Sequence, residues 1–285
     1  CVCTDLDEYF IPDWREQVES AWAEGAQQLR YPYVWSFNAD GSEGTFFYAD
    51  KMHARQGFEW IHPVHEVLRY TGGGEAQRAL CQGMRLEHHP DAQKSRAQYL
   101  PLLELAVQEA PQDDRSLHYL GREYLFHQRW NDCIATLKRH LALPSATWRD
   151  ERCASMRYIA RAYGARGNAY EQECYLLRAA GEAPHLREPW LDLARMYYAR
   201  QNWPGVAYAC ERALQITDRP RTYMTEPDSF GALPWDLLSI ACYQLEQYPR
   251  AAQAAREALR LAPQDARIAE NVRLMEEKVE CGAEE

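Results

Sequence analysis

The sequence predicts an α/β domain followed by an all-α solenoid of helical hairpins, with helix predominating in the chain as a whole. Two observations lead to this expectation: a change of pattern near residue 91, and a repeat in the second part. Before residue 91, apolar and aromatic runs are short and are interrupted by Gly and Pro, which is typical of mixed strands and turns. After it, apolar residues recur at helical spacing almost continuously. We therefore expect two domains, 1–91 and 92–285.

Composition excludes several classes of protein. The net charge of −10 disfavours nucleic acid as a partner, because phosphate backbones repel an acidic surface. No apolar run reaches the roughly 18–20 residues that a membrane span needs. The nine cysteines are an odd number with no Cys-x-x-Cys spacing, which disfavours a disulfide framework and a zinc ribbon. We therefore expect a protein of the reducing cytoplasm.

The first part alternates short strands with one helix. A helix is predicted over 13–29, with an apolar stripe of Trp14, Val18, Trp22 and Leu29. Strands are predicted over 1–4, 31–37, 45–48, 64–70 and 84–88, with a turn cluster at 38–44. These elements form only part of an α/β domain, since a complete one needs more strands. The chain opens on Cys1 within a predicted strand, so we expect the natural protein to begin earlier.

The second part repeats a pattern of large and small residues that matches the tetratricopeptide repeat. A Leu or Ile at position 7 of each unit recurs at residues 120, 159, 193 and 238. A small residue follows each of them: Gly121, Ala160, Ala194 and Ser239. About four repeats are expected, with a helix over 94–109 leading in, kinked at Pro101, and a capping helix over 265–279. Three prolines within 218–234 predict a non-helical insertion in the array.

Basic and tyrosine side chains recur at the repeat positions that line the inner face of such an array. Position 9 is arginine in three successive units, and positions 2, 5 and 12 add further cations and tyrosines. The residues are Arg115, His118, Arg122, Arg157, Arg161, Arg195, Tyr198 and Tyr243. We expect them to form a groove that binds an acidic peptide, protein or glycan. The alternative is that these arginines pair with glutamates of the array itself.

Asp5 and Asp7 follow the first predicted strand two residues apart. Two carboxylates at a strand end can both face a crevice, and oxygen ligands suit Mn²⁺ or Mg²⁺. Such an ion stabilises charge on the diphosphate of a nucleotide sugar. The alternative is a solvated acidic turn, which an acidic chain produces often.

The segment Cys3–Phe10, with Asp13-Trp14-Arg15 after it, resembles the Asp-x-Asp loop of family 2 (GT-A) glycosyltransferases. Residues 51–66 and 86–90 resemble the acceptor-side segments of the subgroup that carries tetratricopeptide repeats. The resemblance runs in order along nearly the whole chain. The nucleotide-binding half of that family, which should precede Asp5, is missing from this sequence.

The resemblance implies roles for individual residues. Asp5 and Asp7 hold the metal and the diphosphate of a donor, for which a UDP-sugar is expected. His88 or His89 completes the metal shell, unless both are simply surface histidines. Glu66 serves as general base toward the acceptor and His65 orients it, unless both side chains face solvent from a strand. The implied function is therefore glycosyl transfer to an acceptor that the repeats bind. The alternative is a non-catalytic scaffold with a remnant transferase domain.

Overall fold

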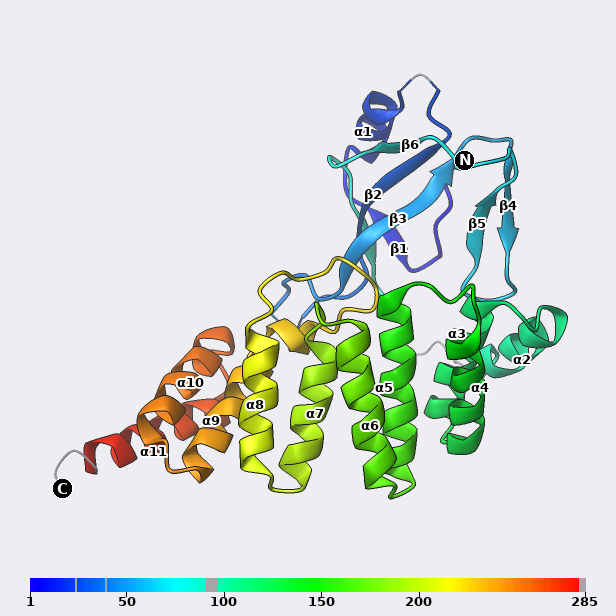
Figure 1. The fold of residues 1–285 in the computed structure, drawn as a ribbon. Helices are drawn as coiled ribbons and strands as arrows, with labels where there is room; N and C mark the ends of the chain where they lie inside the picture. The colour runs from blue at the N-terminus through cyan, green and yellow to red at the C-terminus, as the bar shows by residue number, and fades with distance from the viewer. Residues whose placement is uncertain (24, 39, 91–96, 282–285) are drawn as a thin grey trace. The chain divides into compact units, whose positions relative to one another are not determined.

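The computed structural model describes residues 1–23, 25–38, 40–90 and 97–281 (Figure 1). The chain forms two compact units. Unit 1 comprises Cys1–Leu120 and Arg221–Tyr223, and unit 2 comprises Gly121–Pro220 and Met224–Glu285. The predicted domain boundary, between residues 91 and 92, lies outside the described residues and stays a prediction.

Unit 1 is built on a twisted sheet whose central strand is β2. The strand order is β1-β7-β2-β3, and β6 also pairs with β2. β2 is antiparallel to β3 but parallel to β6 and β7, while β1 is antiparallel to β7. A separate two-stranded sheet consists of β4 and β5. The bounds are β1 Glu8–Phe10, β2 Gln28–Val34, β3 Phe46–His53, β4 Phe58–Ile61, β5 Val67–Tyr70, β6 Arg78–Leu80 and β7 Leu86–His88.

The core of unit 1 explains why the predicted helix 13–29 is too long. Helix α1 covers only Trp14–Ala21. Leu29 is fully buried in β2, where its backbone lies opposite Met52 of β3 and Ala79 of β6. Alternate residues of β2 enter the core, as the period of a half-buried strand requires. Tertiary packing therefore places residues 28–30 in the sheet, although the apolar stripe at helical spacing predicted a helix there.

Other strands differ from their predicted bounds. Of residues 1–4, only Val2 forms a bridge, with Met52, and the regular strand β1 follows the acidic turn instead of preceding it. The strand predicted over 64–70 begins only at Val67. His65 has φ of 55°, which regular strand geometry does not allow. The strands β4 and β6 were not predicted, because their short runs carry no clear alternation.

Unit 1 also contains helix α2, Tyr99–Glu109, and the beginning of helix α3, Asp114–Phe126. The helix was predicted over 94–109. Residues 97 and 98 precede α2 instead of belonging to it, and residues 94–96 lie outside the described part of the chain. Pro101 stands in the first turn of α2, where a missing N–H is tolerated. The predicted kink is therefore replaced by a helix start.

Unit 2 is a stack of antiparallel helical hairpins. Each helix packs on its sequence neighbours, and the first helices of successive hairpins also touch, α5 with α7 and α7 with α9. A small residue at position 8 lets the two helices of a hairpin pack closely. A methyl group on Gly121 of α3 would lie 2.3 Å from the side chain of Leu137 in α4. The helices are α4 Trp130–Ala142, α5 Arg149–Ala165, α6 Ala169–Glu182, α7 Glu188–Ala199, α8 Trp203–Leu214, α9 Leu233–Gln244, α10 Tyr248–Leu261 and α11 Ala266–Cys281.

The segment predicted as an insertion lies between α8 and α9, and its last two residues belong to α9. Before α9, its only regular element is the short 3-10 helix η1, Pro227–Phe230. Arg187 holds this segment to the array by donating hydrogen bonds to the carbonyl oxygens of Ile216 and Ser229, at 2.7 and 3.1 Å. Its guanidinium also lies over the ring of Phe230.

Across the described residues, no helix combines the length and apolar character that crossing a bilayer requires.

Candidate functional site

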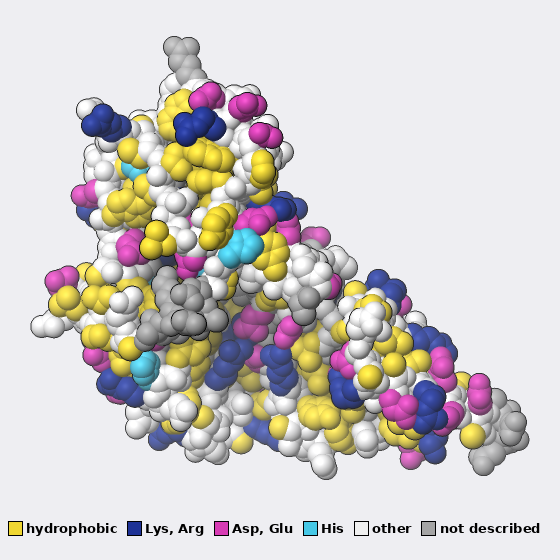
Figure 2. Space-filling view, turned by 180° about the vertical axis from the view of Figure 1, so that it is seen from behind, with side chains coloured by type: hydrophobic (Ala, Val, Ile, Leu, Met, Phe, Trp, Pro, Cys, Tyr) yellow, Lys and Arg dark blue, Asp and Glu magenta, His cyan; other side chains and the backbone are white. Residues whose placement is uncertain are grey.

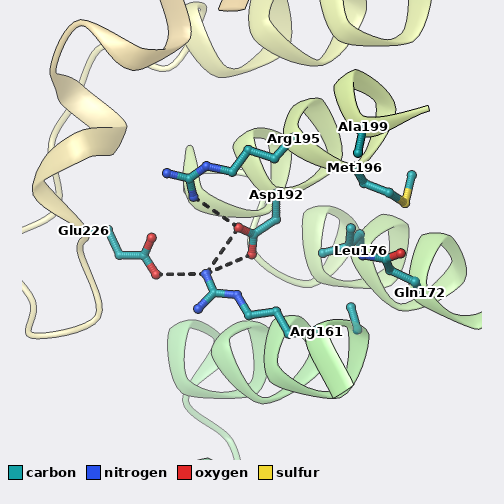
Figure 3. Close-up of a pocket in the computed structure, with 9 residues that line it drawn as sticks. Arg161, Gln172, Leu176, Asp192, Arg195, Met196, Ala199 and Glu226 are labelled. Atoms are coloured by element: carbon teal, nitrogen blue, oxygen red, sulfur yellow. Dashed lines mark hydrogen bonds and ion pairs between the residues drawn. The ribbon is translucent and has the colours of Figure 1, made fainter. Parts of the chain in front are cut away.

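Unit 2 contains a pocket of about 540 Å³ on helices α5, α6 and α7 (Figure 3). One end is charged, where Arg161, Arg195 and Asp192 meet Glu226 of the insertion. The other end is formed mainly by aliphatic side chains, among them those of Leu176 and Met196. The pocket therefore places an ionic cluster beside an apolar surface.

Asp192 is the centre of the ionic cluster. Its carboxylate is 8% exposed, and Arg157 donates to it from Nε at 2.7 Å. Burial alone raises the pKa of Asp192, but Arg157 and Arg161 outweigh burial and lower that pKa below its usual value. Asp192 is therefore a buried carboxylate held in its charged form.

Arg157 is the buried cation of the cluster. Its side chain is 3% exposed, and besides Asp192 it contacts Glu226 at 2.8 Å from Nη2. Burial lowers its pKa, but the two carboxylates outweigh burial and raise it. Because it is buried and doubly paired, Arg157 supports the cluster and does not offer a free surface to a partner.

Arg161 and Arg195 form the accessible side of the cluster, with about 40% of each side chain exposed. Arg161 Nη2 lies 3.2 Å from Asp192 and 3.3 Å from Glu226. Arg195 makes only long ion pairs, 3.6 Å to Asp192 and 3.9 Å to Asp228. Within the described residues Arg195 donates no hydrogen bond to a side chain. Its guanidinium therefore retains donors for a ligand.

Glu226 reaches the cluster from the insertion. Burial raises its pKa, but Arg157 and Arg161 outweigh burial and lower it, so the side chain stays ionised. Its backbone N–H donates to Glu188 Oε1 at 3.0 Å. Glu188 itself is 1% exposed, and desolvation raises its pKa.

The arginines predicted to line a groove thus pair, in three cases, with acids of unit 2. Figure 2 shows the same intermixing on the face of the helical array that it presents, where basic side chains lie among acidic ones. The alternative of pairing with glutamates is met only in part, because the central acid is the aspartate Asp192 and Glu226 belongs to the insertion. Asp192 and Glu226 were missed, although three arginines on one face of an acidic chain signal that nearby carboxylates must neutralise them.

The remaining predicted partner residues do not join this cluster. His118 is fully buried, which corrects its predicted place on a groove surface. Arg115 donates to the carbonyl oxygen of His65 within unit 1. The guanidinium of Arg122 lies 5.9 Å from the centre of the Phe126 ring. Two tyrosines pack edge-on against the next helix of their hairpins, Tyr198 on Trp203 and Tyr243 on Tyr248.

In unit 1, two of the four predicted metal ligands lie together. His88 Nε2 is 3.6 Å from Asp7 Oδ2. Nδ1 of the same ring lies 3.0 Å from the carbonyl oxygen of Trp35, so it must carry the hydrogen of that bond. In the neutral ring, the lone pair of Nε2 is therefore available on the side of Asp7. This is the arrangement in which histidine serves as a metal ligand.

Asp5 and His89 have other partners. Asp5 is largely exposed and lies 3.3 Å from Lys51 Nζ. His89 Nε2 lies 3.1 Å from a carboxylate oxygen of Glu87. In the described part of the chain, neither joins Asp7 and His88 in a cluster of three ligand atoms. The predicted set of four is thus reduced to one close pair.

Glu8 is a buried carboxylate beside this pair that the sequence analysis missed. Lys51 Nζ lies 2.5 Å from Glu8 Oε1, and the Tyr33 hydroxyl donates to the same oxygen at 2.6 Å. Burial and this carboxylate raise the pKa of Tyr33. Lys51 thereby joins β3 to the acidic turn that contains Asp5.

The predicted catalytic residues lie just before β5. The His65 ring stacks on Tyr119 with 3.9 Å between ring centres, and on its other neighbour Tyr99 at 5.6 Å. Glu66 is exposed. Their catalytic roles stay predictions, because these contacts fix the place of the imidazole without identifying a reaction.

The sequence matches no protein-family model and no curated protein. Solved structures of helical repeat proteins resemble part of the fold. MamA is 15% identical with a TM-score of 0.47, over 59% of this chain and 89% of that chain. The thermophilic TPR protein TTC0263 of Thermus thermophilus is 19% identical with a TM-score of 0.43, over 62% and 88%. Yeast Tom70 is 11% identical with a TM-score of 0.48, over 66% and 37%. At these identities the similarity concerns the fold alone.

Proposed function

We propose that unit 2 is a protein-interaction module that binds an acidic segment of a partner at the pocket on α5, α6 and α7. The observation that carries the proposal is Arg195, an exposed cation whose two ion pairs both exceed hydrogen-bond length. A ligand carboxylate can accept from its unused donors. Arg161 stands across the same pocket and supplies a second cation.

The overall charge of −10 shapes how such binding would proceed. At long range the chain repels an acidic partner, so attraction depends on the local arginines and on short distances. The aliphatic end of the pocket adds contacts that do not depend on charge. We therefore expect modest affinity that falls as salt is raised, with the aliphatic contribution retained.

Titration of the full chain with fluorescein-labelled poly-L-glutamate tests the proposal. Arg195→Glu is expected to weaken binding by about tenfold or more, because a repulsive charge replaces a donor at the site. Arg178→Glu is the matched control, since this exposed arginine of α6 lies outside the pocket. Equal weakening by both variants would show that only total charge matters, and would refute a specific site.

A second candidate function is favoured by the pair Asp7 and His88. The resemblance to family 2 glycosyltransferases implies a divalent metal and a UDP-sugar, and the carboxylate of Asp7 suits Mn²⁺ or Mg²⁺. Asp7 and His88 would hold the ion, which supplies positive charge beside the diphosphate of the donor. Glu66 would accept the proton of the acceptor, and His65 would orient it. This reading adds an enzyme activity to the interaction module.

Calorimetric titration with Mn²⁺, alone and with UDP, tests the second candidate. Asp7→Asn is expected to weaken Mn²⁺ binding by about tenfold or more, because it removes a charged ligand. Asp5→Asn is the control and is expected to change it little, since Asp5 pairs with Lys51. Unchanged Mn²⁺ binding in Asp7→Asn would remove the metal site and the transferase reading that depends on it.

A further inference from the structure

Glu226 occupies the charged end of the pocket although it belongs to no helix of the array. It projects from the insertion toward Arg161, with α5 and α7 on the other side (Figure 3). Its carboxylate oxygen Oε1 lies 2.8 Å from Arg157 Nη2 and 3.3 Å from Arg161 Nη2. Glu226 is thus a carboxylate on a segment outside the helical array that accepts hydrogen bonds from two arginines of the array. This is the chemistry expected of an acidic binding partner.

The aliphatic end of the pocket lies beyond this carboxylate. Leu176 and Met196 line it and are almost fully buried, so they form a floor and not a projecting edge. Ala160, Ala199 and the polar residue Gln172 complete its wall. A ligand that fills the whole pocket therefore needs an acidic group and an aliphatic side chain close together.

We propose that Glu226 is an internal ligand, and that a partner binds by placing its own Asp or Glu side chain where the Glu226 carboxylate lies. The partner segment carries an aliphatic side chain next to that acid, which packs on Leu176 and Met196. This inference rests on the proposed interaction function and specifies the chemistry of the partner. The insertion then regulates access to the site.

Charge balance explains why the exchange selects a carboxylate. Arg157 is 3% exposed, and loss of Glu226 without replacement leaves it paired with Asp192 alone. A partner carboxylate restores the second pair, whereas an amide does not, so neutral ligands lose the exchange. The internal segment also competes at the high effective concentration of a tethered group, which weakens the apparent affinity of the wild-type chain.

The experiment uses a fluorescent peptide that copies residues 222–230 of this chain, and a second peptide in which its Glu is replaced by Gln. Binding of each to the full chain is measured by fluorescence polarisation. Glu226→Gln and Glu226→Ala are both expected to bind the acidic peptide about tenfold or more tightly than wild type, because the internal competitor is removed. Neither variant is expected to gain affinity for the Gln peptide.

Asp228→Asn is the matched control. Its carboxylate is 77% exposed and reaches Arg195 only at 3.9 Å, so its loss is expected to change affinity less than about twofold. Circular dichroism of every variant confirms that the helices are retained.

Poly-L-glutamate, measured in parallel, separates the two proposals. If the Glu226 variants gain no affinity while Arg195→Glu still weakens poly-L-glutamate binding by about tenfold or more, the exchange is wrong and the interaction function stands. If no variant and no probe shows binding, both are refuted.

Discussion

Both units bury a carboxylate, and they neutralise it in different ways. In unit 2, Asp192 is held by arginines that recur on one face of the helices, with Arg157 nearest at 2.7 Å. In unit 1, Glu8 receives a single ammonium, from Lys51, and the hydroxyl of Tyr33. The arginines around Asp192 also bind a second carboxylate, Glu226, which a partner carboxylate can replace. The partners of Glu8 bind no second carboxylate that could be exchanged in this way. The ionic cluster of unit 2 is therefore suited to recognition, and Glu8 to holding the sheet and the acidic turn together.

Removing the main cation from each carboxylate produces the largest expected difference. Arg157→Leu leaves Asp192 buried and undercompensated, at a cost of about 3–5 kcal/mol in the free energy of unfolding. Lys51→Met is expected to cost less, about 1–3 kcal/mol, because Glu8 keeps the Tyr33 hydrogen bond. Urea titration followed at 222 nm reports on the helices, and hydrogen exchange of the β2 amides reports on the sheet.

Arg178→Leu serves as the reference for a surface arginine, with an expected change within about 0.5 kcal/mol. A cost of Arg157→Leu no greater than this reference would show that the buried cluster contributes nothing to stability. A cost of Lys51→Met above that of Arg157→Leu would reverse the comparison between the units.

Alkaline pH should produce a more gradual difference, which is smaller for each titrating group. Burial raises the pKa of Cys133, Cys153 and Cys210 in unit 2 to about 12. Thiols of the unfolded chain titrate near pH 8.5, so above that pH the unfolded chain loses protons that the folded chain keeps. This part of the stability is fully present below about pH 8.5 and is lost as pH rises toward 12. Each thiol lowers the free energy of unfolding by about 1.4 kcal/mol per pH unit.

Urea titrations at pH 8, 9 and 10 under reducing conditions measure this decline. Cys153→Ala should reduce the slope of this decline with pH by the contribution of one thiol. Replacement of the exposed Cys281 by Ala should leave the slope unchanged. In unit 1, burial raises the pKa of the Cys81 thiol in the same way, and above about pH 10 two buried phenols should add to the loss of stability. There burial raises the pKa of Tyr31 and Tyr33, so their phenols stay protonated longer than in the unfolded chain. Identical slopes for all variants would contradict the role of the buried thiols.

The same contrast explains what the sequence could predict. The helical hairpins of unit 2 were predicted from the repeat, because each helix packs on neighbours at fixed spacing and small residues such as Gly121 mark the contacts. The strands of unit 1 depend on pairing between distant segments. Leu29 illustrates this: its local context favours helix, and only Met52 and Ala79 place it in a sheet.

The candidate site divides along the same line. Helical spacing placed Arg157, Arg161 and Arg195 on one face. It could not place Glu226, because the course of the insertion follows from contacts such as those of Arg187 and from no periodic pattern. In unit 1, the two-residue spacing drew attention to Asp5 and Asp7, but the position of the His88 ring 3.6 Å from Asp7 follows from the pairing of β1 with β7.

The central claim is that an acidic ligand binds at the accessible arginines of unit 2, and arginine footprinting tests it most directly. Phenylglyoxal modifies accessible guanidinium groups, and mass spectrometry gives the rate at each residue with and without saturating poly-L-glutamate. The account predicts that the ligand slows modification of Arg161 and Arg195 by about threefold or more, while the rate at Arg178 stays the same. Equal rates at Arg161 and Arg195 with bound and free chain, or protection of Arg178 to the same extent, would contradict it.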